Sequence, residues 1–174
     1  HTRLTNQIDR VRSVWQGSDS LDGQAVYQKQ NLTKSAISGL EIDAALKMTE
    51  TLSLHTGFTW LYGENTETYE PMRRIPPANG KAALLFERKR FYLESALLWA
   101  TKQSRLSQGD KDDYRIPEGG TPGWTVVNVT GGYTWAHAGV YGGLTNVFNT
   151  AYRTHGSGID GMGRSVWLSV RVKI

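Results

Sequence analysis

Cysteine is absent from the 174 residues of this chain. A small secreted protein held by disulfides is therefore excluded, and so is a metal site built on thiolates. The chain also lacks any run of about 18 apolar residues, which excludes a membrane protein built from helices. Its 20 Lys and Arg stand against 16 Asp and Glu without a basic run, so we expect no nucleic-acid partner.

The chain is instead rich in glycine and aromatic residues, with 19 Gly, 6 Trp, 8 Tyr and 4 Phe. Together with evenly spread apolar residues, this argues against disorder. The first residues, His1-Thr-Arg-Leu, lack the charged and apolar regions of a signal peptide, so we expect a processed chain or a fragment.

Apolar and polar residues alternate along most of the chain, most clearly in segment 165–174, where Val166, Leu168, Val170, Val172 and Ile174 are separated by mainly polar residues. Successive strand side chains point to opposite faces, so one face of each such strand is apolar and the other polar. The pattern predicts about eight strands, at 3–15, 40–48, 52–64, 80–87, 91–102, 124–135, 137–148 and 165–174. Several have the roughly ten residues that a tilted membrane-spanning strand needs.

The connections between these segments alternate in length. Short turns are expected at 49–51, 88–90 and 136, and long loops at 16–24, 65–77, 104–123 and 150–163. Outer-membrane barrels show the same asymmetry, with short periplasmic turns and long extracellular loops. The sequence therefore predicts an all-β, antiparallel, up-and-down transmembrane β-barrel with a periplasmic C-terminus.

Aromatic residues near the strand ends point the same way. We expect these rings at the two membrane interfaces: Trp60, Tyr62, Trp99 and Trp124 beside the long loops, and Tyr133 and Trp135 beside the short turns. A soluble β-sandwich or lipocalin-like barrel with inward apolar faces is the alternative, but it gives aromatic residues no reason to gather at strand ends.

Three stretches resemble the barrels of TonB-dependent outer-membrane receptors. They are the segment 36–45 followed by Thr51-Leu-Ser-Leu, the entry Arg74-Ile-Pro-Pro77, and Leu144-Thr-Asn-Val-Phe-Asn-Thr-Ala-Tyr152 before the last strand. One departure is the end of the chain, because the family commonly ends in an aromatic residue and this sequence ends in Ile174.

The resemblance implies that residues 1–174 are the C-terminal segment of a 22-strand barrel, without the plug domain and the N-terminal strands. Such receptors import ferric siderophores, haem or cobalamin across the outer membrane of Gram-negative bacteria. The implied partners are the plug domain, the remaining barrel strands, the TonB complex acting through the missing plug, a small-molecule metal chelate and outer-membrane lipid. The alternative is a complete small eight-strand outer-membrane protein with a structural or adhesive role.

Two groups of residues are candidates for function. Polar residues on the inward faces are expected to line the lumen or contact the plug: Glu41, Asp43, His55, Glu87, Glu94 and Arg171. Residues of the long loops are expected to bind the ligand: Arg73, Arg74, Tyr114, Arg115, Arg153, His155 and Arg164. The guanidinium groups suit an anionic metal chelate, and equally the phosphates of lipopolysaccharide.

Other motifs receive plainer interpretations. The stretch from Gly156 to Gly161 matches G-x-G-x-x-G, but no helix pattern follows it, so a flexible loop is expected. The acidic stretch from Asp110 to Asp113 is interpreted as a solvated loop rather than a calcium site, and His155 as a solvated histidine. No catalytic set, metal site or cofactor is expected. A fragment with open strand edges should close on itself, pair its edges with another copy, or come from a nicked receptor.

Overall fold

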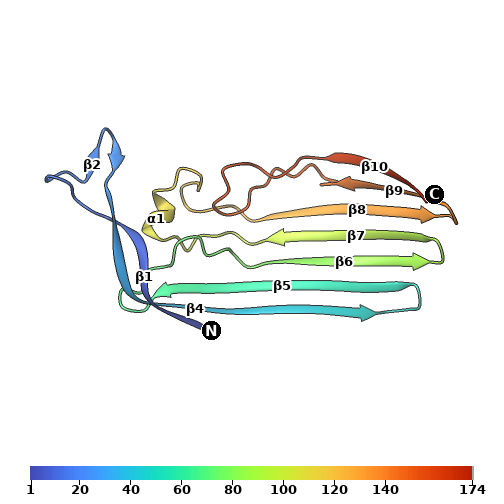
Figure 1. The fold of residues 1–174 in the computed structure, drawn as a ribbon, viewed down its shortest axis with the longest axis horizontal. Coiled ribbons are helices and arrows are strands. Elements are labelled where there is room, and N and C mark those ends of the chain that lie inside the picture. The colour runs from blue at the N-terminus through green and yellow to red at the C-terminus, as the bar shows by residue number, and fades with distance from the viewer. Residues whose placement is uncertain (174) are drawn as a thin grey trace.

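A computed structural model describes residues 1–173, and Ile174 lies outside the described residues. Eight strands form one antiparallel sheet in the order β1-β4-β5-β6-β7-β8-β9-β10, and β2 pairs with β3 in a separate hairpin (Figure 1). The strands are β1 Thr2–Arg12, β2 Ser20–Leu21, β3 Gln24–Ala25, β4 Tyr27–Lys47, β5 Leu52–Asn65, β6 Asn79–Arg88, β7 Phe91–Ala100, β8 Trp124–Thr134, β9 Ala138–Thr145 and β10 Ser165–Val172. The predicted all-β, up-and-down meander is confirmed.

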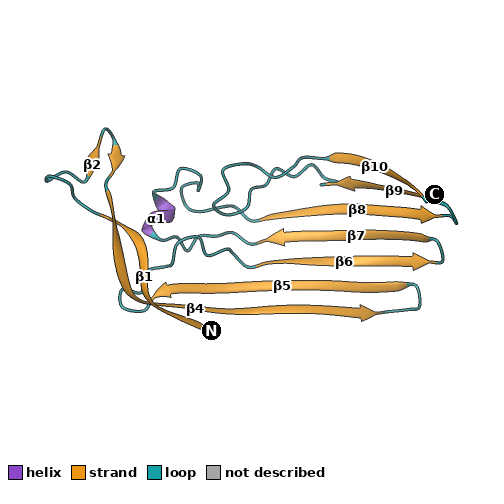
Figure 2. Cartoon of the chain, in the orientation of Figure 1, coloured by secondary structure: helices purple, strands orange, loops and turns teal. Residues whose placement is uncertain are grey.

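The connections differ in length at the two ends of the sheet, as expected. Residues 48–51, 89–90 and 135–137 join neighbouring strands at one end, while 66–78, 101–123 and 146–164 join them at the other. Figure 2 shows these long connections gathered at the end that carries the only helical turn drawn, α1 (Gln108–Lys111).

The strand register sorts the side chains onto two faces. Directly paired residues of an antiparallel sheet point to the same side. Leu54 pairs with Leu84, and Leu84 with Ser95, whereas Ser53 pairs with Leu85, and Leu85 with Glu94. Following these pairs from β4 to β10 gives one mainly apolar face and one mainly polar face. The apolar face includes Leu40, Ile42, Leu46, Leu54, Phe58, Leu84, Leu93, Leu97, Val127, Val129, Val140, Leu144, Val166, Leu168, Val170 and Val172.

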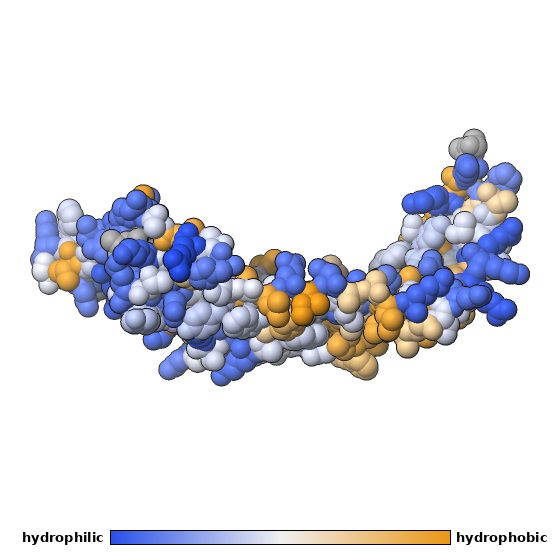
Figure 3. Space-filling view, turned by 90° about the horizontal axis from the view of Figure 1, so that it is seen from below, coloured by the Kyte–Doolittle hydropathy of each residue, from blue (hydrophilic) through white to orange (hydrophobic). Residues whose placement is uncertain are grey.

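The apolar face is uncovered. Leu168 is 75% exposed and Leu40 is 52% exposed, and the buried apolar residues described are four small side chains and Ile116. Figure 3 shows a curved body with apolar atoms gathered in its middle and polar atoms at both ends. This arrangement contradicts a soluble barrel that turns its apolar face inward, because no second layer covers that face within residues 1–173.

Strand β4 is much longer than the predicted segment 40–48. It begins at Tyr27 and has 21 residues, of which 27–34 pair with β1 alone among the described strands. Together with β1 and the β2–β3 hairpin, this part forms an arm that bends away from the sheet (Figure 1). The arm escaped prediction because its sequence, from Gln28 to Lys34, is largely polar and carries no alternation.

The sheet is open. Strands β1 and β10 lie at its opposite edges, and no pairing between them occurs in the described part of the chain. Each edge therefore presents unpaired backbone groups. Of the three outcomes expected for a fragment, closure on itself does not occur in the described residues. No helix within residues 1–173 has the length and apolar content to cross a membrane.

Candidate functional site

The helical turn α1 organises the long-loop end of the sheet. Ser107 caps it: the Ser107 hydroxyl oxygen accepts from the Asp110 backbone N–H at 3.1 Å, and the Asp110 carboxylate accepts from the Ser107 backbone N–H at 3.2 Å. Asp110 also accepts from the Arg74 backbone N–H at 3.1 Å. The spacing Ser107-x-x-Asp110 is a capping-box signature, and it is the sequence signal that would have revealed this turn.

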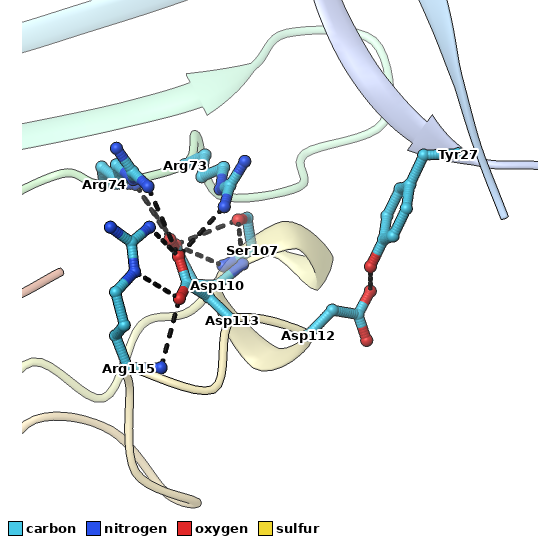
Figure 4. Close-up of polar contacts among 8 residues, drawn as sticks. All are labelled: Tyr27, Arg73, Arg74, Ser107, Asp110, Asp112, Asp113 and Arg115. Atoms are coloured by element: carbon cyan, nitrogen blue, oxygen red, sulfur yellow. Dashed lines mark hydrogen bonds and ion pairs between the residues drawn. The ribbon is translucent and has the colours of Figure 1, made fainter. Parts of the chain in front are cut away.

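The interpretation of residues 110–113 as a solvated acidic loop is wrong. Asp110 is 1% exposed and Asp113 is 7% exposed. Three guanidinium groups converge on Asp113, donating from Arg115 at 2.8 and 2.5 Å, from Arg73 at 3.1 Å and from Arg74 at 3.4 Å (Figure 4). The hydrogen bonds from Arg115, followed by that from Arg73, hold the pKa of Asp113 well below its ordinary value, and burial only partly opposes them.

The neighbouring carboxylate, Asp112, points toward the arm, where Arg12 pairs with Tyr27 at the end of the β1–β4 ladder. It accepts from Arg12 Nε at 3.2 Å and Nη2 at 3.1 Å. It also accepts from the Tyr27 hydroxyl (Figure 4). Burial raises the pKa of Asp112, but the hydrogen bonds from Tyr27 and Arg12 outweigh it and leave the pKa below its ordinary value.

The structure therefore brings together only part of the predicted ligand-binding set. Arg73, Arg74 and Arg115 meet at Asp113, which partly neutralises them. Arg153 forms a separate pair with Asp160 at 2.7 Å. Tyr114, in contrast, is 95% exposed. Ligand binding by these residues stays a prediction.

His155 is not the solvated residue that was expected. Its Nδ1 lies 2.9 Å from the Thr121 hydroxyl, and its Nε2 is buried without a hydrogen-bond partner among the described residues. Burial lowers the pKa of His155. Arg164, from the same long connection, donates its backbone N–H to Asn149 at 2.9 Å.

A cavity of about 490 Å³ lies where the long loops meet the polar face. Its wall includes Asp43 and Lys81 from the sheet, His155 from a loop, and Trp124. Trp124 pairs with Ala100, and Ala100 lies on the polar face, so Trp124 lies on the polar face too. The ring centroids of Trp124 and Tyr152 are 4.8 Å apart. The prediction that Trp124 belongs to the apolar face is therefore wrong: it was placed by its nearness to a loop, whereas the strand register decides the face.

The other predicted interface residues lie on or continue the apolar face, near its two ends. Trp60 and Tyr62 lie together at the long-loop end, with centroids 6.3 Å apart, and Trp99 stacks on Phe58 at 6.0 Å. At the short-turn end the Tyr133 and Trp135 rings are 4.7 Å apart. Their contact with a membrane interface stays a prediction.

Arg105, which the sequence did not single out, covers the ring of Tyr62. Its guanidinium carbon lies 3.9 Å from the ring centroid, and it also bonds the Glu64 carboxylate at 3.3 Å. A guanidinium over an aromatic face gains a cation–π attraction. The contact ties loop 101–123 to the end of β5.

The six residues expected to face the lumen share one side of the sheet. The register places Glu41, Asp43, His55, Glu87, Glu94 and Arg171 on the polar face. Arg171 lies 5.8 Å from the centroid of Tyr141, whose ring lies close over Gly139 and Gly132. Part of the polar face is thus lined by rings packed against glycines, which accounts for Gly132 and Gly139 in these strands.

Asn146 is a further buried residue that the sequence did not identify. Its side chain donates to Thr150 O at 2.9 Å and Met162 O at 3.0 Å, and accepts from Thr150 N at 2.8 Å. It therefore closes the connection 146–164 at its base. Within residues 1–173 no group of three or more His, Cys, Asp or Glu is placed to hold a metal ion.

Comparison with known families identifies the class. Residues 1–147 match the family model described as TonB dependent receptor-like, beta-barrel, and the chain belongs to this family. The family consists of outer-membrane transporters of Gram-negative bacteria rather than enzymes. None of the curated proteins matches the chain.

Solved structures agree on the fold. The copper transporter OprC has a TM-score of 0.73 and 19% identity, covering 83% of this chain and 24% of its own. The ferric enterobactin receptor PfeA in complex with BCV-L6 has a TM-score of 0.70 and 18% identity, covering 97% and 27%. The ferric yersiniabactin receptor FyuA from Yersinia pestis has a TM-score of 0.64 and 15% identity, covering 83% and 24%. The chain thus spans about a quarter of each similar structure.

Proposed function

We propose that residues 1–174 form the C-terminal wall of a 22-strand TonB-dependent receptor that actively imports an iron complex, a ferric siderophore or haem, or else cobalamin. The main support is one arrangement: an uncovered apolar face, an opposite polar face, and long loops that meet the polar face at a cavity of about 490 Å³. An outer-membrane transporter of a large solute needs an apolar outer face in contact with lipid, a polar inner face that lines a water-filled lumen, and a solute-binding surface at one end.

The open edges support a larger assembly. Strands β1 and β10 would pair with the remaining barrel strands, because unpaired backbone groups are costly in lipid. The six polar-face residues, Glu41, Asp43, His55, Glu87, Glu94 and Arg171, would face the lumen and the N-terminal plug, and the plug would connect the barrel to the TonB complex. A complete eight-strand barrel is less well supported, because it requires a β1–β10 pairing.

The cargo proposal rests on the loop chemistry and on similar proteins. PfeA and FyuA are ferric-siderophore receptors by their descriptions, whereas OprC is a copper transporter. The loops of this chain offer exposed Tyr114 and an excess of guanidinium over the carboxylate of Asp113. Such a surface favours an anionic metal chelate over a free cation. Lipopolysaccharide phosphates are the competing ligand for the same residues.

Uptake by the full-length receptor tests the proposal. Cells that lack it should lose energy-dependent accumulation of one member of a panel of ferric siderophores, haem and cobalamin, and a plasmid copy should restore it. A proton uncoupler or deletion of the TonB gene should abolish the restored uptake. Passage that survives both treatments, or a native gene product of only this length, would overturn the receptor proposal.

A further inference from the structure

We propose that the segment from Ser107 to Arg115, here called the acidic latch, couples four extracellular connections so that they open as one body. The connections are the arm, formed by β1, the β2–β3 hairpin and residues 27–34, and the loops 66–78, 101–123 and 146–164. Their extracellular position rests on the function proposed above, whereas the coupling itself rests on the contacts alone.

The three carboxylates of the latch serve different elements. Asp110 closes the cap with Ser107 and accepts from the backbone of Arg74. Asp112 reaches Arg12 and Tyr27, which pair with each other in the arm at the end of the β1–β4 ladder. Asp113 gathers guanidinium groups from loop 66–78 and from its own loop (Figure 4). One short segment thus joins the arm to two of the loops.

The fourth connection, 146–164, lies against the same groups. A Cβ at Gly158 would come within 3.4 Å of Arg115 Cδ, and one at Gly156 within 3.9 Å of Arg74 Cγ. His155 contacts the Thr121 hydroxyl at 2.9 Å. This loop therefore packs on the arginines that the latch positions, without a carboxylate of its own at the latch.

Burial makes these contacts effective. The Asp113 side chain is 3% exposed and that of Asp112 is 13% exposed, whereas Asp160, which bonds Arg153 within one loop, is 70% exposed. Charge-assisted hydrogen bonds are strong where water is excluded, while exposed ion pairs contribute little. Moving the arm away would take Arg12 and Tyr27 from the largely buried Asp112 carboxylate, and moving loop 66–78 away would take Arg73 and Arg74 from Asp113. These two connections are therefore held to the latch by charge, and loop 146–164 by packing on Arg74 and Arg115.

Amide hydrogen exchange tests the coupling in the full-length receptor, embedded in outer-membrane vesicles and without ligand. Asp113→Asn should accelerate exchange about tenfold in the arm, in loop 66–78 and in loop 146–164 together, since local opening governs exchange. The matched control is Asp160→Asn, which should affect loop 146–164 alone. Acceleration in Asp113→Asn that stays within residues 73–74 and 107–115 would overturn the coupling, and so would no change.

A milder variant covers the case in which Asp113→Asn does not assemble. Arg74→Gln removes the longest of the three guanidinium contacts and keeps those of Arg73 and Arg115. It should accelerate exchange in the same three regions by a smaller factor, and a purely local change would again overturn the coupling. Uptake is measured separately: coupled exchange in a receptor that imports none of the panel would overturn the proposed function and leave the latch intact.

Discussion

Leu84 and Leu85 are neighbours in β6 that face opposite sides of the sheet. Leu84 is paired with Leu54 on the apolar face, while Leu85 is paired with Glu94 on the polar face. Both lie in the middle of the strand, so they share one depth but face different surroundings.

Arginine at these two positions should therefore have opposite consequences. Leu84→Arg should destabilise the inserted barrel by about 2–4 kcal/mol, because it puts a charge on the lipid side near the bilayer midplane. Leu85→Arg should be tolerated, since Glu94 faces the new guanidinium. The measurement is the amount of folded receptor in the outer membrane, from its heat-modifiable mobility on gels. Equal loss in both variants would contradict the assignment of the two faces.

Asn146→Ala should lower the free energy of local opening of loop 146–164 by about 3 kcal/mol. The substitution removes three buried hydrogen bonds and leaves backbone groups unsatisfied. Asn149→Ala is the matched control. Both asparagines have a left-handed φ, 49° and 53°, but Asn149 is exposed and accepts one bond. Protease cleavage of the loop on intact cells should rise much more for Asn146→Ala. Equal cleavage of the two variants would show that the left-handed backbone, and not the hydrogen bonds of Asn146, determines the stability of the loop.

The acidic latch should resist mild acid. The pKa of Asp113 in the folded protein lies below its ordinary value of 3.8, so the latch has its full stability above that pH and loses it as pH falls further. A spin label on a cysteine replacing exposed Glu118 should stay largely immobile from pH 7 to 5 and become fully mobile only below about 3.8. Mobility that is already complete at pH 5 would contradict this. The absence of other cysteines in the chain makes the label unique within it.

Protonation of His155 should destabilise the loops in a separate pH range, closer to neutral. Its pKa in the folded protein lies below 6.5, so the unfolded chain takes up a proton first and stability is lost as pH falls below 6.5. The label at position 118 should therefore gain slight mobility between pH 6.5 and 5 in the native sequence. In His155→Gln it should not, and an identical pH response in both proteins would exclude His155 as its source.

Much of the sheet could be predicted from sequence because its two faces differ so strongly. Strands β5 to β8 and β10 lie within a few residues of the predicted segments, since alternation is clear wherever one face is apolar. The beginning of β4 could not be predicted in this way. From Gln28 to Lys34 every residue except Leu32 is polar, so no periodic signal marks the segment as a strand.

The candidate site was harder to predict because distant segments create it. The acidic sequence around Asp113 is typical of an exposed loop. Only folding brings Arg73 and Arg74 to Asp113, from some 40 positions earlier in the chain. Such convergence depends on how loops cross, which local pattern does not encode. Trp124 illustrates a different error, since counting in twos from Val127 already places it on the polar side.

The unusual length of β4 determines which segment lies farthest from the membrane in the proposed orientation. The eight residues 27–34, which pair only with β1 among the described strands, add about 26 Å of strand length beyond the last pair with β5. In the proposed orientation an antibody approaching the cell meets this hairpin before the other loops. Its tight turn at Asp22 and Gly23, both with positive φ, is therefore the natural place to insert an epitope for staining living bacteria.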